Sequence, residues 1–184
     1  GTVLNDKAYV TNSATFESLT DDYVAVIDLE SLTVENTLVL NNRAEQIIGF
    51  DENLYVMNAA FGNGSEMTII EPDESSFETL NIGDGLSSIK RNGNSIYALS
   101  NAGLTEIDLL TDEIVGTQSA PDEILDTQDP DDIKGPKNLV LNESQIYYTF
   151  ENKIYRSDYS DDLLSANEFI NYTSVSGSGN IYGL

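Results

Sequence analysis

Cysteine, histidine and tryptophan are absent from this chain of 184 residues. Without cysteine there is no disulfide, and without cysteine and histidine there is no thiolate or imidazole metal site. The same absences exclude a Ser-His-Asp or Cys-His catalytic relay and any acid-base step on imidazole. The chemistry that remains belongs to carboxylates, hydroxyls and backbone groups: calcium sites, sugar contacts or a pair of catalytic carboxylates.

Positive charge is also scarce, because 8 Lys and Arg stand against 32 Asp and Glu, a net charge of −24. Such a surface lacks the cations that neutralise phosphates, so nucleic acid is not expected as a partner and anionic membranes are poor partners. No apolar run approaches the roughly 18 residues of a membrane-spanning helix, so no span is predicted. Residues 1–6 are typical of neither a signal peptide nor a strand. We therefore expect a cleaved precursor or a fragment of a longer chain.

What the chain does contain is a repeat. A short β-rich phrase centred on tyrosine recurs at intervals of roughly 35 to 50 residues, the range typical of propeller and solenoid repeats. The phrase places its tyrosine at Tyr9, Tyr55, Tyr97, Tyr147 and Tyr182. A second apolar phrase follows each of the first four tyrosines, as in Val24-Ala25-Val26-Ile27-Asp28. Polar turns of the Asn-Gly and Asp-Glu-Asn kind separate the phrases and favour hairpins.

Successive hairpins of this kind predict units of four antiparallel strands, and helical periodicity is nowhere sustained. The predicted fold class is all-β: a β-propeller with about four blades, forming part of a ring of seven or eight. A four-bladed ring closed by residues 173–175 beside Tyr9 is the alternative. We expect the chain to enter at the second strand of its first blade. The predicted segments of this single, partial domain are blades at 1–42, 43–83, 84–119 and 137–172, an acidic inter-blade loop at 120–136, and the start of a fifth blade at 173–184.

The first blade carries a family likeness. Its Tyr9-Val10-Thr11-Asn12, followed by Val24-Ala25-Val26-Ile27-Asp28-Leu29 and Thr33-Val34, resembles the YVTN-type β-propeller repeat. Later blades keep the tyrosine and replace most of the tetrad. The loop Asn58-Ala59-Ala60-Phe61-Gly62-Asn63-Gly64 is similar to a loop in cell-surface propeller lipoproteins of Bacteroidota. The resemblance implies a substrate-capturing role beside an outer-membrane transporter, with corrinoids among the ligands.

The repeated tyrosines themselves are first predicted to pack between blades, where an aromatic ring buries a large area. Candidate ligand contacts lie instead in the loops that join the second strand of a blade to its third, since a rigid ring presents such loops on one rim. An aromatic ring in a polar loop can stack on a flat ligand or a sugar, or can plug its own loop. The candidate ligand-binding residues are Phe16, Asp21, Asp22, Phe61 and Asn63.

The acidic loop at 120–136 offers a candidate calcium site. Ca²⁺ takes six to eight oxygen ligands, and the loop supplies carboxylates at Asp126, Asp129, Asp131 and Asp132. The spacing does not fit the EF-hand pattern. A solvated acidic loop without metal is therefore the other interpretation, and no other cofactor is indicated.

These patterns together favour a non-catalytic, extracellular or cell-surface binding module. Its expected partners are an outer-membrane transporter or another surface protein, with a small ligand or glycan as the captured molecule. A structural role as a surface-layer or adhesin propeller is the first alternative. A carboxylate-dependent hydrolase is the second, although no pair of acids is singled out by the sequence.

Overall fold

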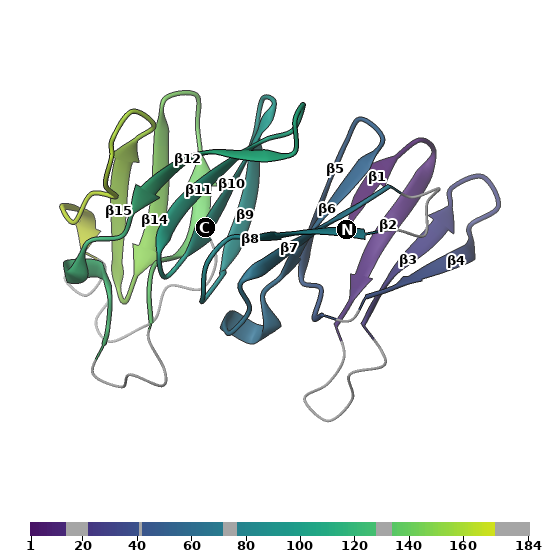
Figure 1. The fold of residues 1–184 in the computed structure, drawn as a ribbon, viewed down its shortest axis with the longest axis horizontal. Coiled ribbons are helices and arrows are strands. Elements are labelled where there is room, and N and C mark those ends of the chain that lie inside the picture. Colours follow the sequence, from purple (N-terminus) through teal and green to yellow (C-terminus); the bar gives the residue numbers. More distant parts are fainter. Residues whose placement is uncertain (14–21, 41, 72–76, 128–133, 172–184) are drawn as a thin grey trace. The chain divides into compact units, whose positions relative to one another are not determined.

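The computed structural model describes residues 1–13, 22–40, 42–71, 77–127 and 134–171. The chain forms two compact units, Gly1–Ile82 and Gly83–Leu184 (Figure 1). The described residues fold into strands and short connections, with two three-residue 3₁₀ turns, η1 (Ala60–Gly62) and η2 (Asp122–Ile124). Among them there is no helix with the length and apolar character that crossing a membrane requires.

The first unit contains two antiparallel sheets of four strands each. One sheet is made of β1 (Thr2–Leu4), β2 (Lys7–Asn12), β3 (Tyr23–Asp28) and β4 (Thr33–Val39). The other is made of β5 (Gln46–Phe50), β6 (Asn53–Asn58), β7 (Glu66–Ile70) and β8 (Phe77–Asn81). In each sheet the strands lie in chain order, so every neighbouring pair is joined by a hairpin connection.

The second unit repeats this arrangement with another two sheets. Its first sheet is made of β9 (Ser88–Asn92), β10 (Ser95–Ser100), β11 (Gly103–Asp108) and β12 (Glu113–Ser119). Its second sheet is made of β13 (Lys137–Leu141), β14 (Gln145–Phe150), β15 (Lys153–Asp158) and β16 (Glu168–Asn171). The prediction of four-stranded antiparallel units is therefore confirmed across the described residues.

The expectation that the chain enters at a second strand is wrong. Strand β1 precedes the Tyr9 strand and pairs with it, so that Thr2 lies opposite Tyr9. The turn between the two strands places Asn5 and Asp6 at φ angles of 49° and 61°. Asparagine and aspartate tolerate this left-handed conformation better than most residues, which explains how so short a strand folds back.

The pairing of third and fourth strands shares an irregularity in three of the four sheets. The register shifts between Val26 and Ile27, between Glu106 and Ile107, and between Ile154 and Tyr155. A bulge at this place bends the outer strand and increases its twist. Three of the four sheets therefore share a backbone irregularity as well as a sequence pattern.

Each unit has its own apolar core between its two sheets. In the first unit, buried Tyr9, Val24 and Val26 cluster with Ile47 and Val56. In the second unit, Leu99, Leu104, Ile146 and Tyr148 belong to a corresponding cluster. Within each unit the first strand of the later sheet lies against the first two strands of the earlier one, as β5 does against β1 and β2. The sheets of a unit therefore approach each other at their inner strands, as adjacent propeller blades do.

The predicted packing role of the tyrosines is confirmed for Tyr9 and Tyr55, which are both buried. Tyr97 is only partly buried and packs at the margin of the second core. In β14 the fully buried aromatic residue is Tyr148 instead of Tyr147. The Tyr148 hydroxyl donates to the backbone carbonyl of Ser165, and its ring stacks on Tyr155 at 5.5 Å between centroids.

Candidate functional site

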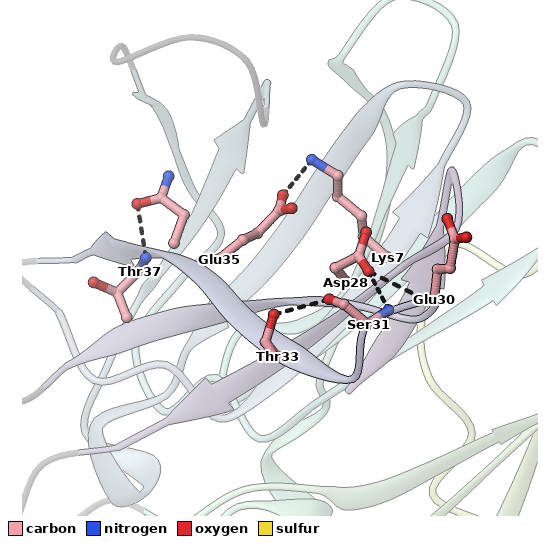
Figure 2. Close-up of polar contacts among 8 residues, drawn as sticks. Lys7, Asp28, Glu30, Ser31, Thr33, Glu35 and Thr37 are labelled. Carbon is pink, nitrogen blue, oxygen red and sulfur yellow. Dashed lines mark hydrogen bonds and ion pairs between the residues drawn. The ribbon is translucent and has the colours of Figure 1, made fainter.

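The turn that joins β3 to β4 lies at the surface of the first unit and is held by several hydrogen bonds. It spans residues 29–32 and is organised by the carboxylate of Asp28 (Figure 2). One oxygen of Asp28 accepts hydrogen bonds from the backbone N–H groups of Glu30 at 3.1 Å and Ser31 at 2.6 Å. The backbone closes over it, because the N–H of Leu32 donates to the carbonyl of Asp28 at 2.9 Å. Asp28 therefore caps this turn through both its side chain and its backbone carbonyl.

The charge state of Asp28 is consistent with its role in the turn. The N–H of Ser31 is the main cause that lowers the pKa of Asp28 below its ordinary value, so the carboxylate is ionised at neutral pH. Lys7 forms an ion pair with Glu35 nearby, and both side chains are about a third exposed. Ion pairs of this kind contribute little to stability. The hydrogen bonds to Asp28 are therefore the main local restraint on the turn.

Leu32 is the unusual residue of the turn. Its φ of 56° lies in the left-handed region, and 76% of its surface is exposed. That conformation costs a residue with a side chain about 1 to 2 kcal/mol. Because its side chain is exposed, Leu32 gains no packing energy to offset this cost. The neighbouring Leu29 is exposed as well. This combination of a left-handed backbone and an exposed apolar side chain makes the turn a candidate binding surface.

The corresponding turn of the third sheet makes the contrast clear. There Asp108 accepts a hydrogen bond from the N–H of Leu110 at 2.7 Å, and the N–H of Asp112 donates to the carbonyl of Asp108 at 2.8 Å. The left-handed position is held by Asp112, at a φ of 58°. Aspartate is among the residues that tolerate this conformation. Sequence reasoning missed Leu32, and the available signal was a leucine where the repeat elsewhere has Asp112.

The predicted ligand loops lie at the other end of their sheets, between β2 and β3 and between β6 and β7. Phe16, Asp21 and the side chain of Phe61 are outside the described residues. Asp22 is fully buried, and its backbone carbonyl accepts from the N–H of Leu40 at 2.8 Å. Asn63 is exposed at the end of η1. The structure therefore separates Asp22 from the surface, and ligand contact by these loops stays a prediction.

Only one residue of the candidate calcium site is described. Asp126 exchanges two backbone hydrogen bonds with Lys134, at 2.7 Å and 3.1 Å. Asp129, Asp131 and Asp132 lie outside the described residues. In the part of the chain that the structure describes, no three acidic side chains gather as metal ligands would. The calcium prediction thus stays untested.

A polar cluster between the two sheets of the second unit surrounds Glu106. The hydroxyls of Ser95 and Tyr97 donate to its carboxylate at 2.7 Å and 3.0 Å. The ring of Tyr97 packs on that of Tyr159 at 5.0 Å, and burial raises the pKa of both phenols. The Tyr159 hydroxyl also donates to the carbonyl of Asn142 at 2.8 Å. These mutual contacts link the two sheets of the second unit.

Comparison with known proteins concerns the fold. No family model matches the chain, and no curated protein sequence matches it either. Among solved structures, the N-terminal domain of Nup159 is similar with a TM-score of 0.61 and 13% identity. The match covers 99% of this chain and 50% of that one. Apo AztD from Citrobacter koseri is similar with a TM-score of 0.54 and 14% identity, covering 97% and 47%.

Both of these proteins are β-propellers, and each match covers almost the whole chain. The chain has a β-propeller fold. Each four-stranded sheet is one blade, so the sheets are called blades one to four below. The chain spans about half the length of the two solved propellers that it matches.

Proposed function

We propose that this propeller is a non-catalytic binding module that holds a protein partner at the Leu32 turn, defined as residues 29–32 with Asp28. One observation carries the proposal: Leu32 is 76% exposed in a left-handed conformation that favours glycine or aspartate. Hydrogen bonds to Asp28 hold the turn in place before a partner arrives. Preorganisation of this kind lowers the entropy cost of binding.

The surroundings of Leu32 define the partner's chemistry. Asp28 and Glu30 belong to the turn that carries the exposed leucines, and Glu35 follows it in β4, where it pairs with Lys7 (Figure 2). A matching surface has an apolar pocket for Leu32 with lysine or arginine at its rim. The net charge of −24 attracts a basic partner over a longer range and speeds encounter. A small neutral ligand would use neither the acidic rim nor the protruding leucine.

We further propose that the module works at the cell surface or outside the cell, beside an outer-membrane transporter or another surface protein. The YVTN-type likeness of the first blade and the acidic composition support this location. Capture of a small ligand or glycan by the loops between second and third strands is compatible with it. Those loops occupy the end of the blade opposite the Leu32 turn, so one protein could use both.

Site-specific photocrosslinking tests the proposed binding surface. A photoreactive amino acid replaces Leu32 in one variant and Leu110, which is 69% exposed in the corresponding turn of blade three, in the control. Irradiation in the source organism is expected to join one defined protein to position 32 and not to position 110. Equal labelling at both positions, or labelling by many unrelated proteins, would contradict the assignment. Calorimetry with glycans and corrinoids tests the second surface separately.

A further inference from the structure

Asparagine followed directly by glycine occurs at two places in the chain, Asn63-Gly64 and Asn92-Gly93. This pair is more reactive than other asparagine pairs, because glycine has no side chain to shield its backbone nitrogen from the preceding asparagine. When that nitrogen attacks the side-chain carbonyl carbon Cγ, the two residues close into a five-membered succinimide ring. The structure distinguishes the two pairs by how freely each can close.

Water is the only co-reactant of this modification. The glycine nitrogen loses its proton and forms a bond to Cγ, while the Cγ–Nδ2 bond breaks and Nδ2 leaves as ammonia. Water then adds across one of the two C–N bonds of the ring. Opening at one bond gives an aspartyl residue. Opening at the other gives an isoaspartyl residue, in which the main chain runs through the former side chain.

The backbone of Asn63-Gly64 is held against ring closure. The N–H of Gly64 donates to the carbonyl of Ala59 at 2.7 Å. A Cβ added to Gly64 would lie 1.9 Å from the backbone oxygen of Asn58, so the loop packs closely on the end of β6. The peptide between Asn63 and Gly64 therefore has little freedom to rotate, and ring closure needs the loop to open first.

The backbone of Asn92-Gly93 lies open in the hairpin turn between β9 and β10. Asn92 pairs with Ser95, which leaves Gly93 and Asn94 as the two central residues of an exposed turn. Beyond its chain neighbours, no atom lies within 4 Å of a Cβ added to Gly93. In the described part of the chain, the N–H of Gly93 has no hydrogen-bond acceptor. Ring closure here therefore breaks no hydrogen bond of the attacking nitrogen.

Two neighbouring side chains act on this turn. Nε of Arg91 donates to the carbonyl of Gly93 at 2.8 Å and brings a positive charge close to the attacking nitrogen. A nearby cation favours the deprotonated form of a nitrogen, which is the nucleophile. On the other side, Nδ2 of Asn92 donates to the Tyr159 hydroxyl at 3.0 Å. The leaving nitrogen is therefore also the atom that ties the turn to Tyr159.

Loss of that nitrogen removes a link between blades three and four. Tyr159 follows β15 of blade four, and its hydroxyl donates its one proton to the carbonyl of Asn142 at 2.8 Å. The hydroxyl oxygen accordingly accepts from position 92, which an amide permits and an ionised carboxylate does not, because a carboxylate has no donor. An isoaspartyl residue also adds a main-chain carbon at the position that pairs with Ser95.

We propose that Asn92 is the site at which this protein deamidates spontaneously in its folded state, and that the product loosens the β9–β10 turn from blade four. Because no enzyme is needed, the modification accumulates with the age of the protein and adds one negative charge per event. The proposal does not depend on the Leu32 turn.

Peptide mapping by mass spectrometry tests the site. The wild-type protein is incubated in a mildly alkaline buffer and cleaved with a lysine-specific protease, which separates the two pairs at Lys90. Deamidation in the folded protein is expected to be more than about tenfold faster at Asn92 than at Asn63. In urea that unfolds the chain, the two rates should become similar, because both pairs are Asn-Gly. No conversion at Asn92, or a folded-state ratio no larger than the ratio in urea, overturns the proposal.

Variants test the predicted loss of the link. Asn92→Asp introduces the carboxylate directly and is expected to lower the urea midpoint of the protein. The same change should have little effect in Tyr159→Phe, which lacks the hydroxyl but keeps the ring that packs on Tyr97. Asn94→Asp makes the same change of charge in the same turn, and this matched control should leave the midpoint unchanged. Equal effects of Asn92→Asp in both backgrounds would contradict the predicted loosening.

Discussion

Two residues of one turn illustrate what sequence can and cannot reveal. Asp28 was predictable, because an aspartate that ends a strand commonly accepts N–H bonds from the following turn. Leu32 was not, since leucine has no preference for a left-handed backbone, and only the structure shows that the hydrogen bonds to Asp28 close the turn in this way. In the structure, Leu32 and Asp112 hold equivalent positions in the turns of the first and third blades, and both have a positive φ.

Replacement of Leu32 by glycine is expected to leave the protein slightly more stable. Glycine relieves the left-handed strain of about 1 to 2 kcal/mol and adds a smaller entropy cost in the unfolded chain. The free energy of unfolding should rise by about 0.5 kcal/mol in urea titrations. Leu110→Gly is the matched control, because Leu110 is also exposed but has no positive φ. That variant should lose about 0.5 to 1 kcal/mol, and equal losses in both would contradict the assigned strain.

The Asp28 carboxylate should give the stability of the first unit a defined pH dependence. Its pKa is lowered in the folded state, so its contribution is present above the unfolded pKa of about 3.9. That contribution is lost as the pH falls through the lower folded pKa. Thermal unfolding of Asp28→Ala against the wild type should therefore show a gap in melting temperature at pH 7 that closes in strong acid. A gap of constant size down to pH 2 would show that the carboxylate charge is unimportant.

At the scale of elements, most strands followed from the sequence. The tyrosine phrases correspond to β2, β6, β10 and β14, since alternation and flanking turns both predict strands there. Strand β1 was missed because it has three residues, although Val3-Leu4 before Asn5-Asp6 repeats the apolar run and polar turn seen before Tyr55. The ligand loops and the acidic loop could not be judged this way, because long loops have no repeating pattern to fix them.

The hairpin between β10 and β11 should depend strongly on Gly103. At Gly103 the φ is 126°, and an added Cβ would lie 2.0 Å from the backbone oxygen of Gln118. Gly103→Ala is expected to lower the free energy of unfolding by about 3 kcal/mol or more, through strain and the clash together. At Gly93 the φ is 60° and nothing lies within 4 Å of the added atom. Gly93→Ala should therefore lose only about 1 kcal/mol. Similar losses for the two variants in urea denaturation would contradict the close approach of Gly103 to Gln118.

For the whole molecule, charge is the dominant property. A net charge of −24 repels itself in the compact state, so salt that screens it should stabilise the fold. The melting temperature is expected to rise steadily with NaCl. A melting temperature that falls with NaCl would contradict this.

Calcium can be separated from general screening by comparing CaCl₂ with MgCl₂ and NaCl at matched ionic strength. An added rise that is specific to Ca²⁺ and lost in Asp126→Asn would support the predicted site in the acidic loop. Equal curves for all three salts would favour the solvated loop. The melting temperature in CaCl₂ therefore distinguishes a calcium site from a solvated acidic loop.

The most direct measurement is the affinity of the protein captured at position 32 for the wild type, Leu32→Gly and Leu110→Gly. Burial of a leucine in a partner's pocket stabilises a complex by roughly 1.5 to 3 kcal/mol, so titration calorimetry should show binding at least about tenfold weaker for Leu32→Gly. Leu110→Gly should bind as the wild type does. Unchanged affinity in a folded Leu32→Gly protein would contradict the proposed binding role of the turn.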